Sequence, residues 1–220
     1  ILASSKRSPE QSQQAIQIRM LAQNMLYPKK EISEIVKHKF KVIVTYDTPD
    51  LNLDNCINSL LNQNYDRFSI CCLSNKKKHS SYFNSLEEEK LSTHQGYLAS
   101  AIQTFNDEAI LIIPADSCFI YSNGLSIINQ QLNERDTLLF YGQHLFSNGT
   151  YGDNFPLTPT INIANAPILK QKPSWLLIKS QTKVKDVITA EMDFSSLSKT
   201  LIETESNRFF IEHPLFMKTH

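Results

Sequence analysis

Residues 40–65 read FKVIVTYDTPDLNLDNCINSLLNQNY and combine three structural signals in one short run. The segment from Phe40 to Tyr46 is mostly apolar and rich in β-branched residues, which is typical of a buried strand. The residues Thr48, Pro49 and Asp50 then give a turn signal. Apolar side chains follow at helical spacing, at positions 53, 56, 57, 60 and 61. A strand that leads through a turn into an amphipathic helix is the repeating unit of α/β folds.

The same alternation continues along the chain. Further strands are predicted over residues 68–73, 109–113, 137–141, 175–178 and 208–211, with His213 and Pro214 ending the last one. Helices are predicted over residues 96–105, 123–132 and 194–202, and a short helix is predicted around residues 82–90 in a polar stretch. Apolar strands that alternate with amphipathic helices predict a mostly parallel sheet flanked by helices, an α/β Rossmann-like architecture.

The sequence predicts two parts, an N-terminal extension and a main domain. Residues 1–37 are predicted to form a helical N-terminal extension, with one helix over residues 9–27 and a charged second helix over residues 31–37. Residues 38–220 form the main domain, in which residues 147–173 are expected to be a long loop of the kind that often carries function. The chain starts at Ile1 without a methionine, so we expect it to be a piece of a longer protein with further domains.

Composition bounds the functional classes. Lysine plus arginine and aspartate plus glutamate both number 22, and this zero formal net charge predicts no nucleic-acid partner. No apolar stretch approaches the ~20 residues that span a bilayer, so no transmembrane segment is expected. The four cysteines lack metal-site or redox spacing, which favours buried thiols in a reducing compartment. We therefore expect a cytoplasmic location, and the alternative is peripheral attachment at the inner face of the membrane. The abundance of Asn, Lys and Ile favours a bacterial source.

Candidate chemistry lies where the strands end, because open α/β sheets bind ligands beyond the carboxyl ends of their strands. Polar residues lie at the end of the first predicted strand at 45–47, and they follow the second at 74–75 and the third at 116–117. A lone Asp at a strand end is more often a turn former than a ligand. No glycine-rich phosphate loop follows the first strand, which argues against a dinucleotide enzyme and a P-loop nucleotidase. The single tryptophan, Trp175, is expected in the core rather than stacked on a ligand.

Five blocks in the correct order resemble the family 2 glycosyltransferases, which are inverting enzymes with the GT-A fold. The most specific block is residues 41–66, with SLLNQNY at the end of its helix. FSICCLSN (68–75) resembles the family's second strand, and AILIIPADS (109–117) resembles the strand with the Asp-x-Asp metal motif. AEMDF (190–194) lies where the family has its acidic catalytic pair, and FFIEHPLFMKTH (209–220) is similar to the closing segment. The resemblance covers about residues 38–220.

The resemblance implies transfer of a sugar from a UDP-sugar or another nucleotide-sugar to a glycan or lipid-linked acceptor, as in polysaccharide biosynthesis. It implies Mn²⁺ or Mg²⁺ as cofactor, with Asp116 and His220 as metal-binding residues, because a hard cation neutralises the diphosphate leaving group. It implies Asp193 as the catalytic base, with Glu191 as a neighbour that could substitute. The remaining donor-binding residues that it implies are Thr45, Tyr46, Asp47, Ser74, Ala115 and Lys218.

The chain departs from the family pattern at several positions. Pro114 replaces the first Asp of Asp-x-Asp, and Ser74 with Asn75 replaces an Asp-Asp pair. Met217 and Lys218 replace Tyr-Arg, and residues 92–106 contain no Arg where the family has one. These departures leave two alternatives to an active transferase. One is a catalytically inactive glycosyltransferase-like binding or scaffold domain, and the other is an unrelated doubly wound nucleotide-binding domain.

Overall fold

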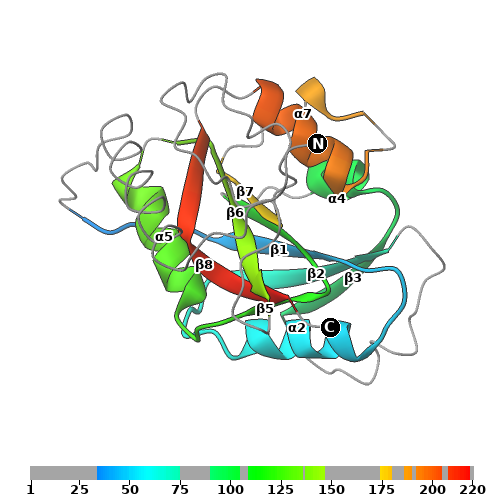
Figure 1. Cartoon of the computed structure of the whole chain (residues 1–220), viewed down its shortest axis with the longest axis horizontal. Coiled ribbons are helices and arrows are strands. Elements are labelled where there is room, and N and C mark those ends of the chain that lie inside the picture. The colour runs from blue at the N-terminus through cyan, green and yellow to red at the C-terminus, as the bar shows by residue number, and fades with distance from the viewer. Residues whose placement is uncertain are drawn as a thin grey trace, which may run out of the picture.

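The computed structural model describes residues 34–74, 90–104, 109–135, 137–146, 174–179, 186–189, 192–204 and 208–218. These residues form one eight-stranded sheet in the order β3-β2-β1-β4-β7-β6-β8-β5, with helices on both faces (Figure 1). The strands are β1 (Phe40–Thr45), β2 (Phe68–Ser74), β3 (Leu91–Gln95), β4 (Ala109–Pro114), β5 (Ser117–Phe119), β6 (Leu139–Phe146), β7 (Trp175–Ile178) and β8 (Arg208–Lys218). The helices are α2 (Leu51–Leu61), α4 (Leu98–Thr104), α5 (Gly124–Glu134) and α7 (Phe194–Thr204).

The sheet is mixed and mostly parallel. Strands β3, β2, β1 and β4 are parallel neighbours, and β6 is parallel to β8. Strand β7 runs antiparallel to both β4 and β6, and β5 runs antiparallel to β8. The predicted strand at 175–178 is thus present as β7, and it is antiparallel to both of its neighbours.

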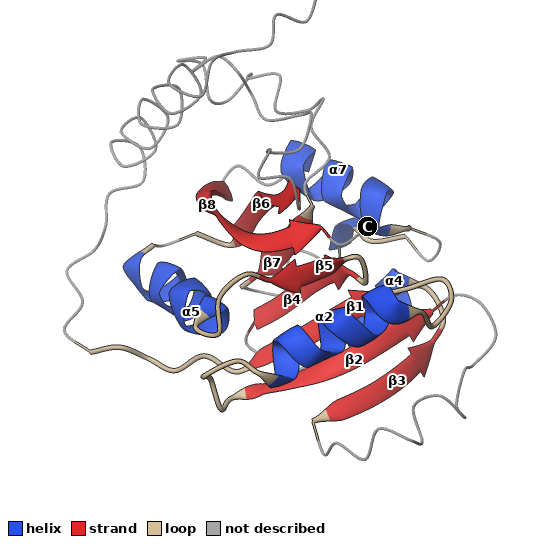
Figure 2. Cartoon of the chain, turned by 60° about the horizontal axis from the view of Figure 1, so that its bottom comes forward, coloured by secondary structure: helices blue, strands red, loops and turns tan. Residues whose placement is uncertain are grey.

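The two faces of the sheet bury separate apolar clusters. Alternate residues of β1 point to opposite faces, so Val42 and Val44 join one cluster while Ile43 joins the other. Helices α2 and α5 pack on the first face, and α4 and α7 pack on the second (Figure 2). The four cysteines are all buried, as predicted, and none of them forms a disulfide. This two-sided burial explains why β1, β2 and β4 are continuous apolar runs in the sequence.

Helix α2 anchors the segment that follows β4. The Ser59 hydroxyl accepts a hydrogen bond from the Phe119 backbone N–H at 3.1 Å. The Gln63 side chain donates to the Tyr121 carbonyl at 2.9 Å and accepts from the Leu125 N–H at 3.0 Å. The motif SLLNQNY therefore has a structural task, because two of its polar side chains hold β5 and the start of α5 in place.

Residues 34–39 are irregular, so the second helix predicted over residues 31–37 is wrong for the part that the structure describes. Backbone N–H groups of this segment donate hydrogen bonds to side chains of α5, where in a helix they would donate to backbone carbonyls. The N–H of Val36 donates to Asn133 Oδ1, and the N–H of His38 donates to Asn129 Oδ1, both at 2.9 Å. The Tyr65 hydroxyl, 2.6 Å from the His38 carbonyl, fixes the same segment.

Strands β3 and β5 were not predicted from the sequence, and β6 and β8 extend beyond their predicted ends. Strand β3 lies at the edge of the sheet, where the sequence is polar and predicts no strand. Strand β8 continues to Lys218 instead of ending at His213 and Pro214. Its register against β6 shifts between the pairs Gly142–Ile211 and His144–Phe216, so β8 has extra residues there. Such a bulge accommodates a proline, which has no N–H for the ladder.

Other predictions fall outside the described residues. They are the helix over residues 9–27, most of the helix around residues 82–90, and the long loop over residues 147–173. No helix in the described part of the chain is both long and apolar enough to span a membrane.

Candidate functional site

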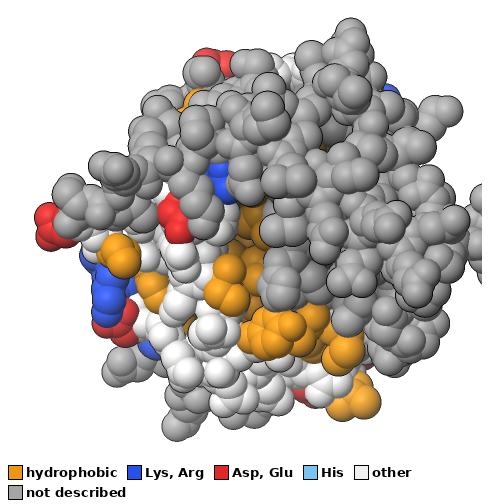
Figure 3. Space-filling view, turned by 60° about the vertical axis from the view of Figure 1, so that its left-hand side comes forward, with side chains coloured by type: hydrophobic (Ala, Val, Ile, Leu, Met, Phe, Trp, Pro, Cys, Tyr) orange, Lys and Arg blue, Asp and Glu red, His pale blue; other side chains and the backbone are white. Residues whose placement is uncertain are grey.

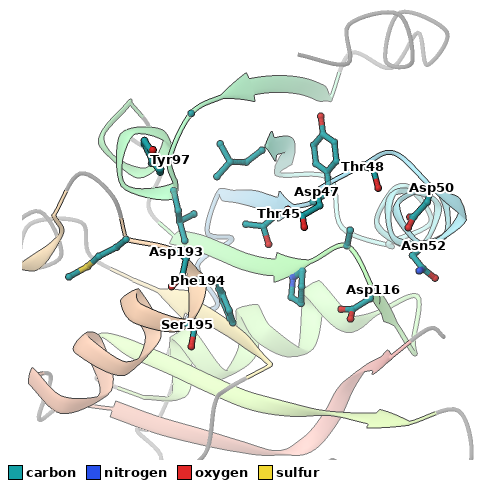
Figure 4. Close-up of a pocket in the computed structure, with 17 residues that line it drawn as sticks. Thr45, Asp47, Thr48, Asp50, Asn52, Tyr97, Asp116, Asp193, Phe194 and Ser195 are labelled. Atoms are coloured by element: carbon teal, nitrogen blue, oxygen red, sulfur yellow. The ribbon is translucent and has the colours of Figure 1, made fainter. Parts of the chain in front are cut away.

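A cavity of about 580 Å³ lies beyond the carboxyl ends of β1 and β4. One wall carries Thr45, Tyr46 and Asp47 from the end of β1, and the residues 114–116 that follow β4 lie beside them. The start of α2 contributes a second edge, and the segments that begin α4 and α7 close the opposite side (Figure 4). The cavity therefore occupies the place where a parallel α/β sheet binds its ligand.

Backbone hydrogen bonds beyond the regular strands hold these walls together. The N–H of Tyr46 donates to the Leu73 carbonyl at 3.0 Å, and the N–H of Ala115 donates to the Thr45 carbonyl at 2.9 Å. The N–H of Gly96 donates to the Ser74 carbonyl at 3.0 Å. Three parallel strands thus end at one level, and the residues that follow them are fixed by main-chain bonds rather than by flexible side chains.

Most of the predicted site residues that the structure describes meet in this cavity. Its lining includes Thr45, Tyr46, Asp47, Ala115, Asp116 and Asp193. Ser74 is 3% exposed and is not among the lining residues. Lys218 reaches the site through Asp116. Glu191 and His220 lie outside the described residues.

Asp116 and Lys218 form an ion pair, with 3.1 Å between Asp116 Oδ2 and Lys218 Nζ. The antiparallel pairing of β5 with β8 sets Lys218 opposite Ser117, the residue next to Asp116, and this register brings the two charges together. About one third of each side chain is exposed, so the pair lies at the border between cavity and solvent. The residue expected to bind a metal is therefore paired with a residue expected to bind the nucleotide-sugar donor.

Two other carboxylates of the cavity cap helices. Asp50 Oδ1 accepts from the Leu53 N–H at 3.0 Å and caps α2. Asp193 Oδ1 accepts from the Ser196 N–H at 2.7 Å, and the Asp193 carbonyl accepts from the Leu197 N–H at 2.9 Å at the start of α7. These bonds satisfy N–H groups that a helix leaves without partners, and the helix dipole stabilises the negative charge there.

The described residues do not fit a divalent cation. The cavity has four carboxylates, of which Asp50 and Asp193 cap helices and Asp116 is paired with Lys218. Within the described ranges, no three His, Cys, Asp or Glu side chains are grouped so that they could hold a metal. Mn²⁺ and Mg²⁺ prefer oxygen ligands, and at phosphate sites Mg²⁺ is held by one or two carboxylates that bind it directly, so a carboxylate already paired with an ammonium is a poor ligand. The predicted metal site is not confirmed.

Tyr46 is a mostly buried tyrosine that lines the cavity. Burial raises the pKa of this phenol to about 12, and the nearby thiols of Cys72 and Cys71 add to the shift. The group therefore stays protonated at neutral pH and can both donate and accept a hydrogen bond.

Sequence reasoning missed several lining residues, which are Thr48, Asp50, Asn52, Tyr97 and Phe194. Asp50 was visible only as part of a turn signal. Tyr97 follows Gly96, whose φ of +147° favours glycine, and such a residue beside a strand end marks a sharp turn into the cavity. The Tyr97 side chain is 48% exposed, which leaves its ring accessible at the rim. Trp175, in contrast, is fully buried in the core, as predicted.

Comparison with known proteins identifies the fold. No protein-family profile and no curated protein matches the sequence. Among solved structures, a fragment of S. aureus TarS, residues 1–349, is similar with a TM-score of 0.65 and 16% identity, and the match covers 82% of this chain and 60% of that one. The same fragment in complex with UDP-GlcNAc gives a TM-score of 0.65 and 15% identity, with 83% and 58% covered.

A second similar structure is the mannosyltransferase PcManGT from Pyrobaculum calidifontis in complex with GDP-Man and Mn²⁺. Its TM-score is 0.59 at 12% identity, and the match covers 95% of this chain and 65% of that one. The chain thus spans less than two thirds of each of these neighbours. At such identities the similarity defines the fold, which is that of the GT-A glycosyltransferases.

Proposed function

We propose that this chain binds a nucleotide-sugar and transfers the sugar to a glycan or lipid-linked acceptor. One observation carries the proposal: residues 45–47 and 114–116 line a single cavity at the carboxyl edge of a GT-A sheet. Its volume of about 580 Å³ lies within the range of small-molecule sites. The neighbours named above were solved with UDP-GlcNAc and with GDP-Man, which supports a nucleoside diphosphate as the common part of the ligand.

Residues at the end of β1 are assigned to the nucleoside. Asp47 and Thr45 offer acceptors and a hydroxyl for base and ribose, and the protonated Tyr46 phenol offers one more donor. Asp116 lies on another part of the wall, and Asp193 lies on the far side of the cavity from Asp116 (Figure 4). A nucleotide placed along this cavity would have its nucleoside near β1 and its sugar toward α7.

Asp193 is the proposed base. An inverting transfer needs a carboxylate that accepts the proton of the acceptor hydroxyl as that oxygen attacks the sugar. The cap bond uses Asp193 Oδ1, and a carboxylate can accept further hydrogen bonds at its other oxygen. By resemblance to the family, Glu191 is the neighbouring carboxylate that could act instead.

Isothermal titration with UDP-GlcNAc, GDP-Man and other UDP-, GDP- and TDP-sugars tests donor binding, and a radiolabelled-sugar assay tests transfer. Asp193→Asn keeps a side-chain oxygen that can cap α7, so the fold should be preserved. We expect it to lower turnover by roughly 10²- to 10⁴-fold, the usual contribution of general base catalysis. Asp66→Asn is the matched control, since Asp66 is exposed and paired with Lys37 away from the cavity.

A specific observation also favours a second candidate, a binding domain without catalysis. Pro114 occupies the position of the first acidic residue of the metal motif, and Asp193 is already engaged as a helix cap. This candidate predicts nucleotide binding without transfer or hydrolysis. The absence of heat with every nucleotide-sugar would remove the support for both candidates.

A further inference from the structure

The Asp116–Lys218 ion pair is the starting point. Lys218 Nζ lies 3.1 Å from a carboxylate that lines the cavity, at the mouth rather than in the protein interior. None of the described residues that line the cavity is a lysine, arginine or histidine. In the described part of the chain, Lys218 therefore brings a positive charge to the border of this acidic cavity, through its ion pair with Asp116.

The charge balance of the cavity matters for an anionic ligand. The negative charges of Asp50 and Asp193 are offset by helix N-termini, and that of Asp116 is offset by Lys218. These local partners reduce the repulsion that four carboxylates would otherwise exert on a diphosphate. A lysine ammonium has three donors on a flexible stem, so it can contact a phosphate oxygen while it remains near Asp116.

A divalent cation and the ammonium compete for the same carboxylate. A metal that binds Asp116 Oδ2 has to displace Lys218 Nζ from it, and the register of β5 and β8 keeps that ammonium close by. In the described part of the chain, no three His, Cys, Asp or Glu side chains are grouped so that they could compensate for this displacement. The donor set therefore suits a fixed organic cation better than Mn²⁺ or Mg²⁺.

We infer that Lys218, which is paired with Asp116 in the ligand-free chain, supplies the positive charge that binds the diphosphate of the ligand, so that nucleotide binding does not depend on a divalent cation. This inference rests on the proposed function and specifies how the same site meets its ligand.

Titration of the full chain with UDP and with GDP, in EDTA and in excess MnCl₂, is the direct test. We expect dissociation constants within about threefold of each other in the two conditions, since the main counter-charge is part of the protein. Binding that requires Mn²⁺ and disappears in EDTA would overturn the inference while leaving the proposed function intact. Absence of binding in both conditions would contradict the proposed function and the inference together.

Variants of the pair sharpen the test. Lys218→Met should weaken UDP binding roughly ten- to hundredfold in EDTA by removing a charge-assisted hydrogen bond, and should leave uridine binding unchanged. Lys218→Arg should retain UDP affinity within roughly threefold because it keeps the charge. Lys37→Met is the matched control, since it breaks a lysine–aspartate pair at the opposite ends of the strands. A Lys218→Met variant that folds and binds UDP like the wild type would refute the assignment.

A variant of Asp116 distinguishes nucleotide binding through Lys218 from nucleotide binding through a divalent cation. Asp116→Asn should tighten UDP binding by a few-fold in EDTA, because it removes a negative charge and releases the ammonium toward the phosphates. If Asp116 is a metal ligand instead, the same variant should abolish binding in MnCl₂. Circular dichroism of each variant shows whether the fold is kept, and the comparison of EDTA with MnCl₂ on the wild type needs no variant at all.

Discussion

Single carboxylates at this site have more than one task. Asp193 caps α7 and also lines the cavity, and Asp116 lines the cavity and holds Lys218. A cap fixes the direction in which a carboxylate points, which preorganises any group that must meet a ligand. The sequence predicted these two residues from the order of the blocks around them. It could not predict the pairing with Lys218, because that contact depends on the register between β5 and β8.

The raised pKa of Tyr46 predicts how the stability of the protein depends on pH. Its folded-state pKa of about 12 exceeds the ordinary value of 10.0. Between these two pH values the unfolded chain loses the phenolic proton and the folded chain keeps it, so the free energy of unfolding falls as pH rises through this window. Urea unfolding across this range should show a steeper loss of stability for the wild type than for Tyr46→Phe. Parallel pH profiles for the two proteins would argue against the buried phenol.

The elements show what the pattern of apolar residues can and cannot predict. Strands β1, β2 and β4 were predicted because burial on both faces produces continuous apolar runs. Strand β3 was missed because it is an edge strand with a polar, half-exposed sequence. The segment before β1 was wrongly predicted as a helix. Its irregular conformation depends on hydrogen bonds to Asn129 and Asn133, which lie far along the chain. Tertiary contacts of this kind leave no local signal.

Gln63 tests how α2 holds the segment after β4. Its buried side chain bonds the Ser59 and Tyr121 carbonyls and the Leu125 N–H, so Gln63→Ala leaves several buried groups without partners. We expect the free energy of unfolding to fall by roughly 2–3 kcal/mol in urea titrations. The control is Asn64→Ala next to it, whose exposed side chain makes one long contact with Ser122, and which should cost less than about 0.5 kcal/mol. Equal effects of the two variants would contradict this account of the motif.

Gly142 tests the packing of β6 on β7. A Cβ at this position would lie 2.7 Å from Trp175 Cζ2 and 2.9 Å from Nε1, and Trp175 is fully buried. Gly142→Ala should destabilise the protein by about 1–3 kcal/mol through overpacking. Trp175→Phe removes the atoms that clash, so in that background the cost of Gly142→Ala should be smaller, with a coupling of about 1 kcal/mol or more. Strictly additive effects in this double-mutant cycle would show that the ring is not the obstacle.

At the scale of the whole molecule, the sheet organises the site. Hydrophobic side chains gather near the middle of the face shown in Figure 3, and charged side chains lie mainly toward its left edge. The parallel strands β1, β2 and β4 end at the cavity, and β5 and β8 bring a separate part of the chain to the same place. Residues from opposite ends of the described chain, Thr45 and Lys218, thus contribute to one region.

The central claim is that this cavity binds a nucleoside diphosphate. A crystal structure of the chain soaked with UDP, and with GDP in a second crystal, examines that claim directly. The account predicts density for the nucleoside beside residues 45–47 and for the diphosphate beside Asp116 and Lys218. Nucleotide bound at another face of the sheet, or a cavity closed by packed side chains in crystals that hold no nucleotide, would contradict it.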